Sequence, residues 1–177
     1  MSELETIASR IRDIGFQCQR CGGCCRGRDM EVMIYPAEVR ALALQSGLSW
    51  EEVAEPYPEQ ITLPSGTICT FEWAIRKREG RCIFLEDGCC RVYSCRPWIC
   101  RTFPFALSGK RLLREECPGL GRETGESEAL ALAQNLISRR EIERGEEDQV
   151  RHYARSLNRV QGSYILIDGE GVRVLDP

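Results

Sequence analysis

The spacing of apolar residues predicts an α-helix close to the start of the chain. Its apolar stripe recurs every three or four positions and consists of Leu4, Ile7, Ala8, Ile11 and Ile14. Ser2 and Glu5 have the spacing of a capping box, and Gly15 is a common type of helix stop. We therefore expect a helix over residues 2–14, followed directly by a glycine-containing loop over 16–28.

The next part of the chain carries short strand and helix signals in turn. Residues 31–35 alternate weakly between apolar and polar and predict a short strand. A helix is expected over 36–47, because proline suits the first turn of a helix and glycine its end. A Ser-x-x-Glu capping box at Ser49 opens a further short helix. Residues 60–73 predict strands around a Pro-Ser-Gly turn.

Two helices and a β-hairpin are expected in the last third of the chain. The apolar periodicity predicts one helix over 126–145 and another over 146–160. Residues 164–167 and 172–175 are apolar runs separated by Asp-Gly-Glu-Gly, which predicts a hairpin. Residues 82–117 have no such periodicity and are interrupted by prolines, so we expect them to be mostly irregular.

Composition and charge exclude several classes of protein. The chain has 177 residues, of which 42% are hydrophobic and 29% charged, as in an ordinary folded domain. Its net charge of −3 argues against nucleic acid as a partner, since phosphate binding needs a basic surplus. No apolar run approaches the roughly 20 residues that span a bilayer, so no membrane insertion is expected. The start of the chain lacks signal-peptide features, and we expect a cytoplasmic location with reduced thiols.

Cysteines carry the chemistry that the sequence predicts. The chain has 11 cysteines, an odd number that cannot pair completely as disulfides. Eight of them form a pattern typical of metal ligands, because thiolates are soft, anionic donors. These predicted metal ligands are Cys18, Cys21, Cys24, Cys25, Cys82, Cys90, Cys100 and Cys117. Cys69, Cys89 and Cys95 are left over and are expected to be inert free thiols, although Cys89 could replace Cys90 as a ligand.

The spacing of the thiols favours an iron–sulfur cluster over zinc. Cys18, Cys21 and Cys24 have the C-x₂-C-x₂-C spacing that holds three irons of a cuboidal cluster. The fourth ligand could be Cys117, which precedes a proline, or Cys100 or Cys90. Zinc usually takes two separate C-x₂-C pairs, and the chain has only one such group. The single histidine, His152, excludes Cys₂His₂ zinc and is expected on a helix surface.

A basic segment accompanies the second group of cysteines. Residues 76–114 hold ten lysines and arginines against three acids, whereas the rest of the chain is acidic. A four-thiolate centre is a net anion, which guanidinium groups stabilise. We expect Arg96 and Arg101, which flank Pro97 and Cys100, to support the cofactor in this way. The outer lysines and arginines could equally form a solvated basic face.

The motifs resemble those of the YkgJ-like CxxCxxCC family of zinc- or iron-chelating domains. The matching pieces are Phe16-x-Cys18-x-x-Cys21-x-x-Cys24-Cys25-x-Gly27, Tyr35-Pro36-x-Glu38, Gly80-x-Cys82-x-Phe84-Leu85, Cys90-x-Val92-Tyr93-x-x-Arg96-Pro97-x-x-Cys100-Arg101-x-Phe103-Pro104 and Cys117-Pro118-Gly119. The resemblance spans about residues 16 to 122 and implies ligation by the eight shared cysteines. A related cysteine group occurs in bacterial flagellin lysine methylases, where a [4Fe-4S] cluster is implied.

These observations predict an α+β fold: a small, irregular, cysteine-rich, metal-stapled domain with flanking helices and a C-terminal β-hairpin. We assign residues 1–122 to the metal-binding domain and 123–177 to a helical extension and hairpin packed on it, as one structural unit. The expected function is binding of one or two [4Fe-4S] clusters for electron transfer or redox or oxygen sensing with a protein partner. A zinc-stapled interaction module is the alternative. A cluster-dependent enzyme is the weakest hypothesis, because the chain shows no phosphate loop and no nucleophile–base pair.

Overall fold

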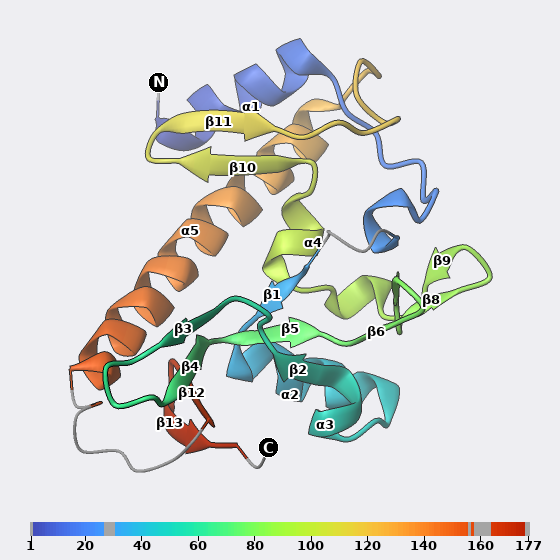
Figure 1. Cartoon of the computed structure of the whole chain (residues 1–177). Coiled ribbons are helices and arrows are strands. Elements are labelled where there is room, and N and C mark those ends of the chain that lie inside the picture. Colours follow the sequence, from blue (N-terminus) through green and yellow to red (C-terminus); the bar gives the residue numbers. More distant parts are fainter. Residues whose placement is uncertain (1, 27–30, 156, 158–163, 176–177) are drawn as a thin grey trace.

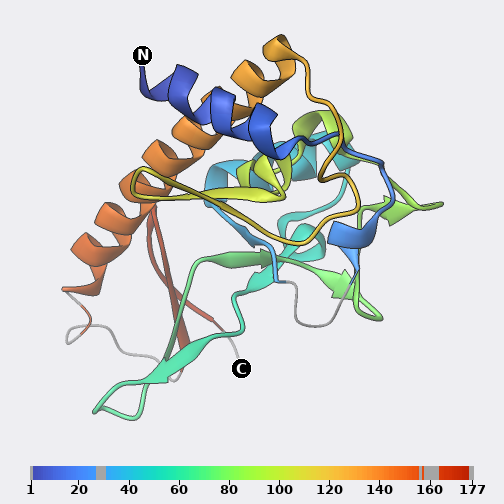
Figure 2. The same ribbon diagram turned by 90° about the horizontal axis from the view of Figure 1, so that it is seen from above.

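The N-terminal helix forms where its apolar stripe and caps predict it. The computed structural model describes residues 2–26, 31–155, 157 and 164–175 (Figure 1). Helix α1, Glu3–Ile14, begins with the predicted Ser2–Glu5 capping box and ends at Gly15. It buries Ile7 and Ile11 against the start of α5, Glu126–Ala154, and the two helices lie side by side (Figure 2).

Helix α5 is one continuous helix of 29 residues, where the sequence predicted two. Gly145 does not end it, because the helix packs against apolar partners on both sides of this position. Leu136 joins the core with α1, and Val150 packs against the sheet that contains β12. A single helical glycine costs only about 1 kcal/mol, which these contacts outweigh. Residues 156 and 158–160 of the predicted second helix lie outside the described residues.

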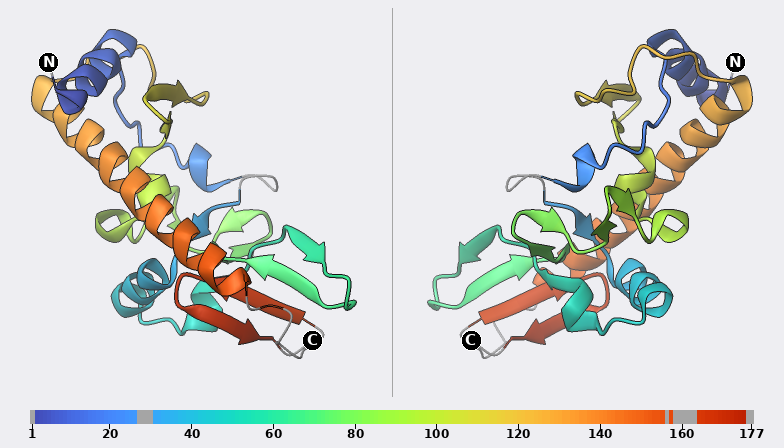
Figure 3. Two further views of the ribbon diagram at one scale, coloured as in Figure 1. Left: turned by 90° about the vertical axis from the view of Figure 1, so that its left-hand side faces the viewer. Right: turned by 90° about the vertical axis from the view of Figure 1, so that its right-hand side faces the viewer.

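A four-stranded sheet lies at the far end of α5. Its strand order is β13-β12-β4-β3, with β3 at Gln60–Thr62, β4 at Ile68–Phe71, β12 at Tyr164–Asp168 and β13 at Gly171–Val174. The predicted terminal hairpin is confirmed as β12–β13, and β12 also pairs in parallel with β4. Figure 3 shows α5 running from α1 to this hairpin, so the two ends of the chain are linked through one helix.

A second sheet has three strands, which all come from residues 33–75. Its order is β1-β5-β2, with β1 at Met33–Ile34, β5 at Trp73–Ile75 and β2 at Ala54–Pro56. Helices α2, Pro36–Ser46, and α3, Trp50–Val53, begin and end at the predicted proline, glycine and capping box. Val39, Leu42 and Val53 are fully buried and fill the core of this part.

One buried glutamate joins the two sheets. Glu72 lies between β4 and β5 with a left-handed backbone (φ 63°), so that the strand leaves one sheet and enters the other. The residue is 5% exposed, and neither carboxyl oxygen has a hydrogen-bond partner among the described residues. Burial, followed by the charges of Glu146 and Asp168, raises the pKa of Glu72 to about 8. The junction therefore holds a carboxyl group that is protonated at neutral pH.

The cysteine-rich segment is more regular than the sequence predicted. It forms a chain of hairpins and one short helix, α4 at Trp98–Thr102. The strands are β6 at Lys77–Arg78, β7 at Arg81–Cys82, β8 at Leu85–Glu86, β9 at Cys89–Cys90, β10 at Phe105–Ser108 and β11 at Arg111–Arg114. Strands this short escape detection by alternation, which is why the expectation of a mostly irregular segment was wrong.

The architecture confirms the predicted α+β class, with helices beside several small sheets and a hairpin at the C-terminal end. Within the described ranges, no helix combines the length and the apolar character that a bilayer crossing requires.

Candidate metal centre

A cavity of about 390 Å³ lies where the N-terminal loop faces the cysteine-rich segment. All eight predicted ligands line it, together with Cys89. Every cysteine of the chain is a free thiol. The tertiary structure thus gathers thiols from residues 18–25, from residues 82–100 and from Cys117 around one space. Their role as metal ligands remains a prediction.

The N-terminal loop reaches Cys117 through a close backbone contact. Gln17 donates its N–H to the carbonyl of Gly119 at 3.0 Å, and a Cβ at Gly119 would collide with the Gln17 carbonyl oxygen. The Thr124 hydroxyl donates to the Phe16 carbonyl at 3.0 Å and accepts the Phe16 N–H at 2.6 Å. These contacts hold Cys18 beside the Cys117 segment, although 99 positions separate the two residues (117 − 18).

The loop then turns tightly and packs on the next hairpin. Gly22 has a left-handed backbone (φ 67°) and precedes a 3-10 turn over Gly23–Cys25. A Cβ on Gly22 would lie 3.0 Å from the Gly88 carbonyl oxygen, so this contact also depends on glycine. The close approach places Cys24 and Cys25 over the hairpin that carries Cys90.

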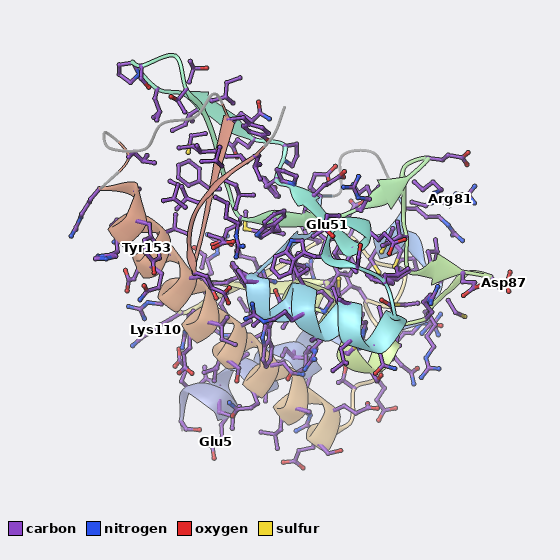
Figure 4. All side chains as sticks on the ribbon, turned by 90° about the horizontal axis from the view of Figure 1, so that it is seen from below. Glu5, Glu51, Arg81, Asp87, Lys110 and Tyr153 are labelled. Atoms are coloured by element: carbon purple, nitrogen blue, oxygen red, sulfur yellow. The ribbon has the colours of Figure 1, made fainter. Side chains whose placement is uncertain are left out.

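Two tight hairpins present Cys82 and Cys90 to the cavity. The turns Glu79–Gly80 and Asp87–Gly88 have positive φ at both central residues, as type I′ hairpins require. In Figure 4, the labels Arg81 and Asp87 mark the outer side of these hairpins. The Glu-Gly and Asp-Gly dipeptides were signals in the sequence that could have predicted both turns.

Helix α4 supplies Cys100 and is anchored from behind. The Trp98 N–H at its first turn donates to Glu38 Oε1 at 2.7 Å, and Glu38 Oε2 accepts the Tyr35 N–H at 3.0 Å. At the other end of α4, Arg139 donates to the buried Thr102 hydroxyl at 2.9 Å. Sequence reasoning did not assign Glu38 and Arg139 to the site, and both act by positioning α4.

Three of the thiols accept a backbone N–H from the residue two positions further along. Phe84 donates to Cys82 and Val92 donates to Cys90, and each contact opposes the rise in pKa that burial causes. Gly119 donates to Cys117 Sγ at 3.5 Å. Such N–H donors favour the thiolate over the thiol, and thiolates are the metal-binding form.

Alongside Arg20, Arg96 is a cation of the cavity wall. It lines the cavity and donates from Nε to the Tyr93 carbonyl at 3.0 Å, with its guanidinium 3.6 Å from the centre of the Tyr93 ring. Arg20 of the N-terminal loop approaches the same ring at 4.8 Å. Arg101 lies over the Trp98 ring and donates to the Arg96 carbonyl, so it reaches the cavity only through Arg96.

The pKa pattern separates an inner set of thiols. Burial raises the pKa of Cys82, Cys90 and Cys100, and the neighbouring cysteines raise it further. The Cys24 and Cys25 sulfurs lie 4.0 Å apart, and the hydrogen bond between them lowers the pKa of Cys24 to about 6 and raises that of Cys25. We define Cys24, Cys25, Cys82, Cys90 and Cys100 as the inner thiols. Cys18, Cys21, Cys89 and Cys117 are the outer thiols, which line the rest of the cavity wall.

The thiols surround a space rather than a single point. Across the parts of the chain that the structure describes, no three His, Cys, Asp or Glu side chains are placed to hold one metal ion. A tetrahedral zinc with Zn–S bonds of about 2.3 Å would hold its sulfurs about 3.8 Å apart, and the Cys24–Cys25 pair, with sulfurs 4.0 Å apart, approaches this spacing. The donor set, all thiols with guanidinium and N–H groups beside them, suits metals that prefer sulfur ligands, such as zinc and iron.

The other cysteines and the histidine lie elsewhere. Cys69 is fully buried in the core of the four-stranded sheet, as expected for an inert thiol. Cys95 is half-buried and donates to the Val92 carbonyl at 3.5 Å, outside the cavity lining. His152 is exposed on α5, as predicted. Among the leftover thiols, therefore, Cys89 is the one that sequence reasoning undervalued.

Comparison with known proteins identifies the family of this site. No solved structure matches the chain. Residues 17–128 match the CxxCxxCC family, described as "Putative zinc- or iron-chelating domain". The matched range covers more than half of the 177 residues and includes all the thiols that line the cavity. The chain therefore belongs to the CxxCxxCC family of zinc- or iron-chelating domains.

Proposed function

We propose that the cavity binds iron–sulfur clusters of the [4Fe-4S] type. The observation that carries this proposal is a cavity of about 390 Å³ walled by nine thiols, no three of which are placed to hold one ion. A single ion needs far less space, since even a water molecule requires only about 15 Å³ by this kind of measure. Cuboidal clusters, in contrast, take thiolates that stand well apart from each other.

The thiols supply two sets of four, and we propose two centres. Cys18, Cys21 and Cys24 with Cys117 form one set, which combines the C-x₂-C-x₂-C spacing with a cysteine before proline. Cys25 with Cys82, Cys90 and Cys100 forms the other. The adjacent Cys24 and Cys25 lie at the boundary, as expected if each serves a different centre.

The proposed role is electron transfer or redox sensing for a protein partner in the reducing cytoplasm. Cys18, Cys21 and Cys89 are exposed, so this wall of the cavity is open to solvent and to a partner. When bound, the cluster supplies a one-electron redox couple. The chain's own contribution is to orient the thiolates, to offset their charge with Arg96 and to shield the inner thiols with Phe84 and Tyr93.

Anaerobic purification tests the cluster directly. We expect a brown protein with a broad absorption band near about 400 nm and about eight irons and eight sulfides per chain. Cys25→Ser should reduce the iron content to about half, and Cys24→Ser should affect the other centre to a similar extent. A colourless protein with stoichiometric zinc would contradict the cluster. A wild-type iron content of about four, abolished by Cys24→Ser and unchanged by Cys25→Ser, would contradict the second centre.

Zinc is the second candidate, and one distance favours it. The Cys24–Cys25 sulfur separation of 4.0 Å is close to that of two ligands on tetrahedral zinc. In that case the metal would replace a missing core and the protein would serve as an interaction module. The same metal analysis decides between the two candidates.

A further inference from the structure

A second cavity, of about 200 Å³, lies behind α4 on the side away from the thiols. Three aromatic rings and three carboxylates line it: Tyr35, Tyr57, Trp98, Glu31, Glu38 and Glu143. None of these residues is a predicted metal ligand, and the function proposed above does not use this cavity. Aromatic faces and carboxylate oxygens share one preference, which is for positive charge.

The chain already places its own cations at this cavity. Lys77 donates to Glu31 at 3.0 Å, and both side chains are at least three-quarters buried. Arg139, which also lines the cavity, donates to Glu143 at 2.6 Å. Glu38 accepts two backbone N–H groups, and no described lysine or arginine lies within ion-pair distance of it. Glu38 therefore makes no ion pair among the described residues; burial raises its pKa, and the charges of Arg101 and Arg139 act from further away in the opposite direction.

The field inside the cavity is negative. Burial raises the pKa of the Tyr35 phenol, and the charges of Glu143, of Glu72 once it ionises above its pKa of about 8, and of Glu38 raise it further against the opposing effect of Arg139. The Glu72 backbone carbonyl accepts the N–H of Tyr57, so Tyr57, which lines the cavity, is held against the junction of the two sheets.

We propose that this cavity binds a protonated primary alkylamine, such as the end of a lysine side chain. The three aromatic residues would surround the alkyl chain, and Glu38 would accept from the ammonium group. A bare metal ion fits less well, because no three acidic or sulfur ligands of the described chain are placed to hold one. A quaternary ammonium has no N–H to donate, so the carboxylates favour the primary amine over it.

The position of the cavity connects the amine to the metal centre. Glu38 holds the first turn of α4 through Trp98, and Arg139 holds its last turn through Thr102. Cys100 lies between these two anchors on the same helix. An amine that hydrogen-bonds to Glu38 would therefore compete with the Trp98 N–H and could shift α4, the helix that carries the predicted metal ligand Cys100. The binding itself does not depend on the metal proposal.

Titration calorimetry of the purified protein with n-butylammonium tests the binding. We expect saturable binding in the millimolar range, with at least tenfold weaker binding of 1-butanol, which has the same shape without the charge. Tetramethylammonium should also bind more weakly. Absence of saturation, or equal binding of the alcohol, would overturn the proposal.

Variants locate the site. Glu38→Gln should weaken n-butylammonium binding about tenfold, and Tyr57→Leu should weaken it at least threefold. Glu51→Gln is the matched control: this exposed glutamate of α3 does not line the cavity, and the variant should bind n-butylammonium like the wild type. If Glu38→Gln loosens α4, Tyr57→Leu still tests the site, because its backbone hydrogen bond to Glu72 is retained. Unchanged binding in Tyr57→Leu would overturn the assignment.

Discussion

The two sides of this molecule are stabilised by different means. Around α1, α5 and the four-stranded sheet, side chains such as Ile11, Leu136, Ile165 and Ile167 are at most 1% exposed. Around the thiols, strands of two residues and tight turns enclose a cavity, and this segment adds few buried side chains, such as Phe84 and Val92, to the core. Apolar burial therefore stabilises the first side, and we expect the second side to depend more strongly on a metal held by the thiols.

Removal of the metal should have the largest effect, because it should destabilise the thiol side and leave the apolar side folded. Structural metal sites contribute on the order of 10 kcal/mol to folding, so the hairpins β6–β7 and β8–β9 should open when the metal is chelated. Helix α5 should keep its protection, because its partners are apolar. Hydrogen exchange measured by mass spectrometry, with and without chelator, should show faster exchange over residues 77–90 and over the loop of residues 16–26, but not over α5. Equal loss of protection in α5 would show that the two sides fold as one unit.

Glu72 tests the apolar side, where an unpartnered carboxyl group is buried. The pKa of Glu72 is raised from 4.5 to about 8, so the folded protein keeps the Glu72 proton in a pH range where the unfolded chain has already lost it. Stability should therefore fall as pH rises from about 4.5 to about 8. Glu72→Gln should remove this contribution and gain about 3 kcal/mol at pH 7, but little at pH 4. Urea unfolding at both pH values measures the difference, and a constant difference would contradict the assignment.

Gly119→Ala should separate the loop of Cys18 from Cys117. The added methyl group would collide with the Gln17 carbonyl oxygen, and overpacking of this kind costs about 1–3 kcal/mol. We expect lower metal content with α5 intact, measured by metal analysis beside far-ultraviolet circular dichroism. Normal metal content in this variant would show that the loop contact does not position the thiols.

Gly145→Ala is the matched substitution on the apolar side, and it should have the smallest effect. Nothing lies within 4 Å of the added methyl group, and the position is inside a regular helix. We expect a stability gain of about 1 kcal/mol with unchanged metal content, measured by thermal unfolding. A loss of stability would indicate that Gly145 serves a bend in α5.

Local signals accounted for the regular elements and missed those with little periodicity. These signals act over a few residues of sequence. They include the Ser2 capping box of α1, the proline and glycine at the ends of α2, and the turn residues of the hairpin β12–β13. The continuity of α5 depends on packing at both ends, so the local break at Gly145 was misleading. The hairpins around Cys82 and Cys90 carried turn signals, but their strands are too short to show a pattern.

The sequence alone determines the type of metal donor, which is the cysteine thiol, and the ends of most helices. These features follow from helix caps, apolar periodicity and thiol spacing, which act over a few positions. The assembly of the site depends on contacts between residues far apart in the chain. The approach of Gly119 to Gln17, the support of α4 by Glu38 and the entry of Cys89 into the cavity wall all belong to this class. Such contacts arise only when the chain has folded, because close backbone approach and burial depend on which surfaces meet.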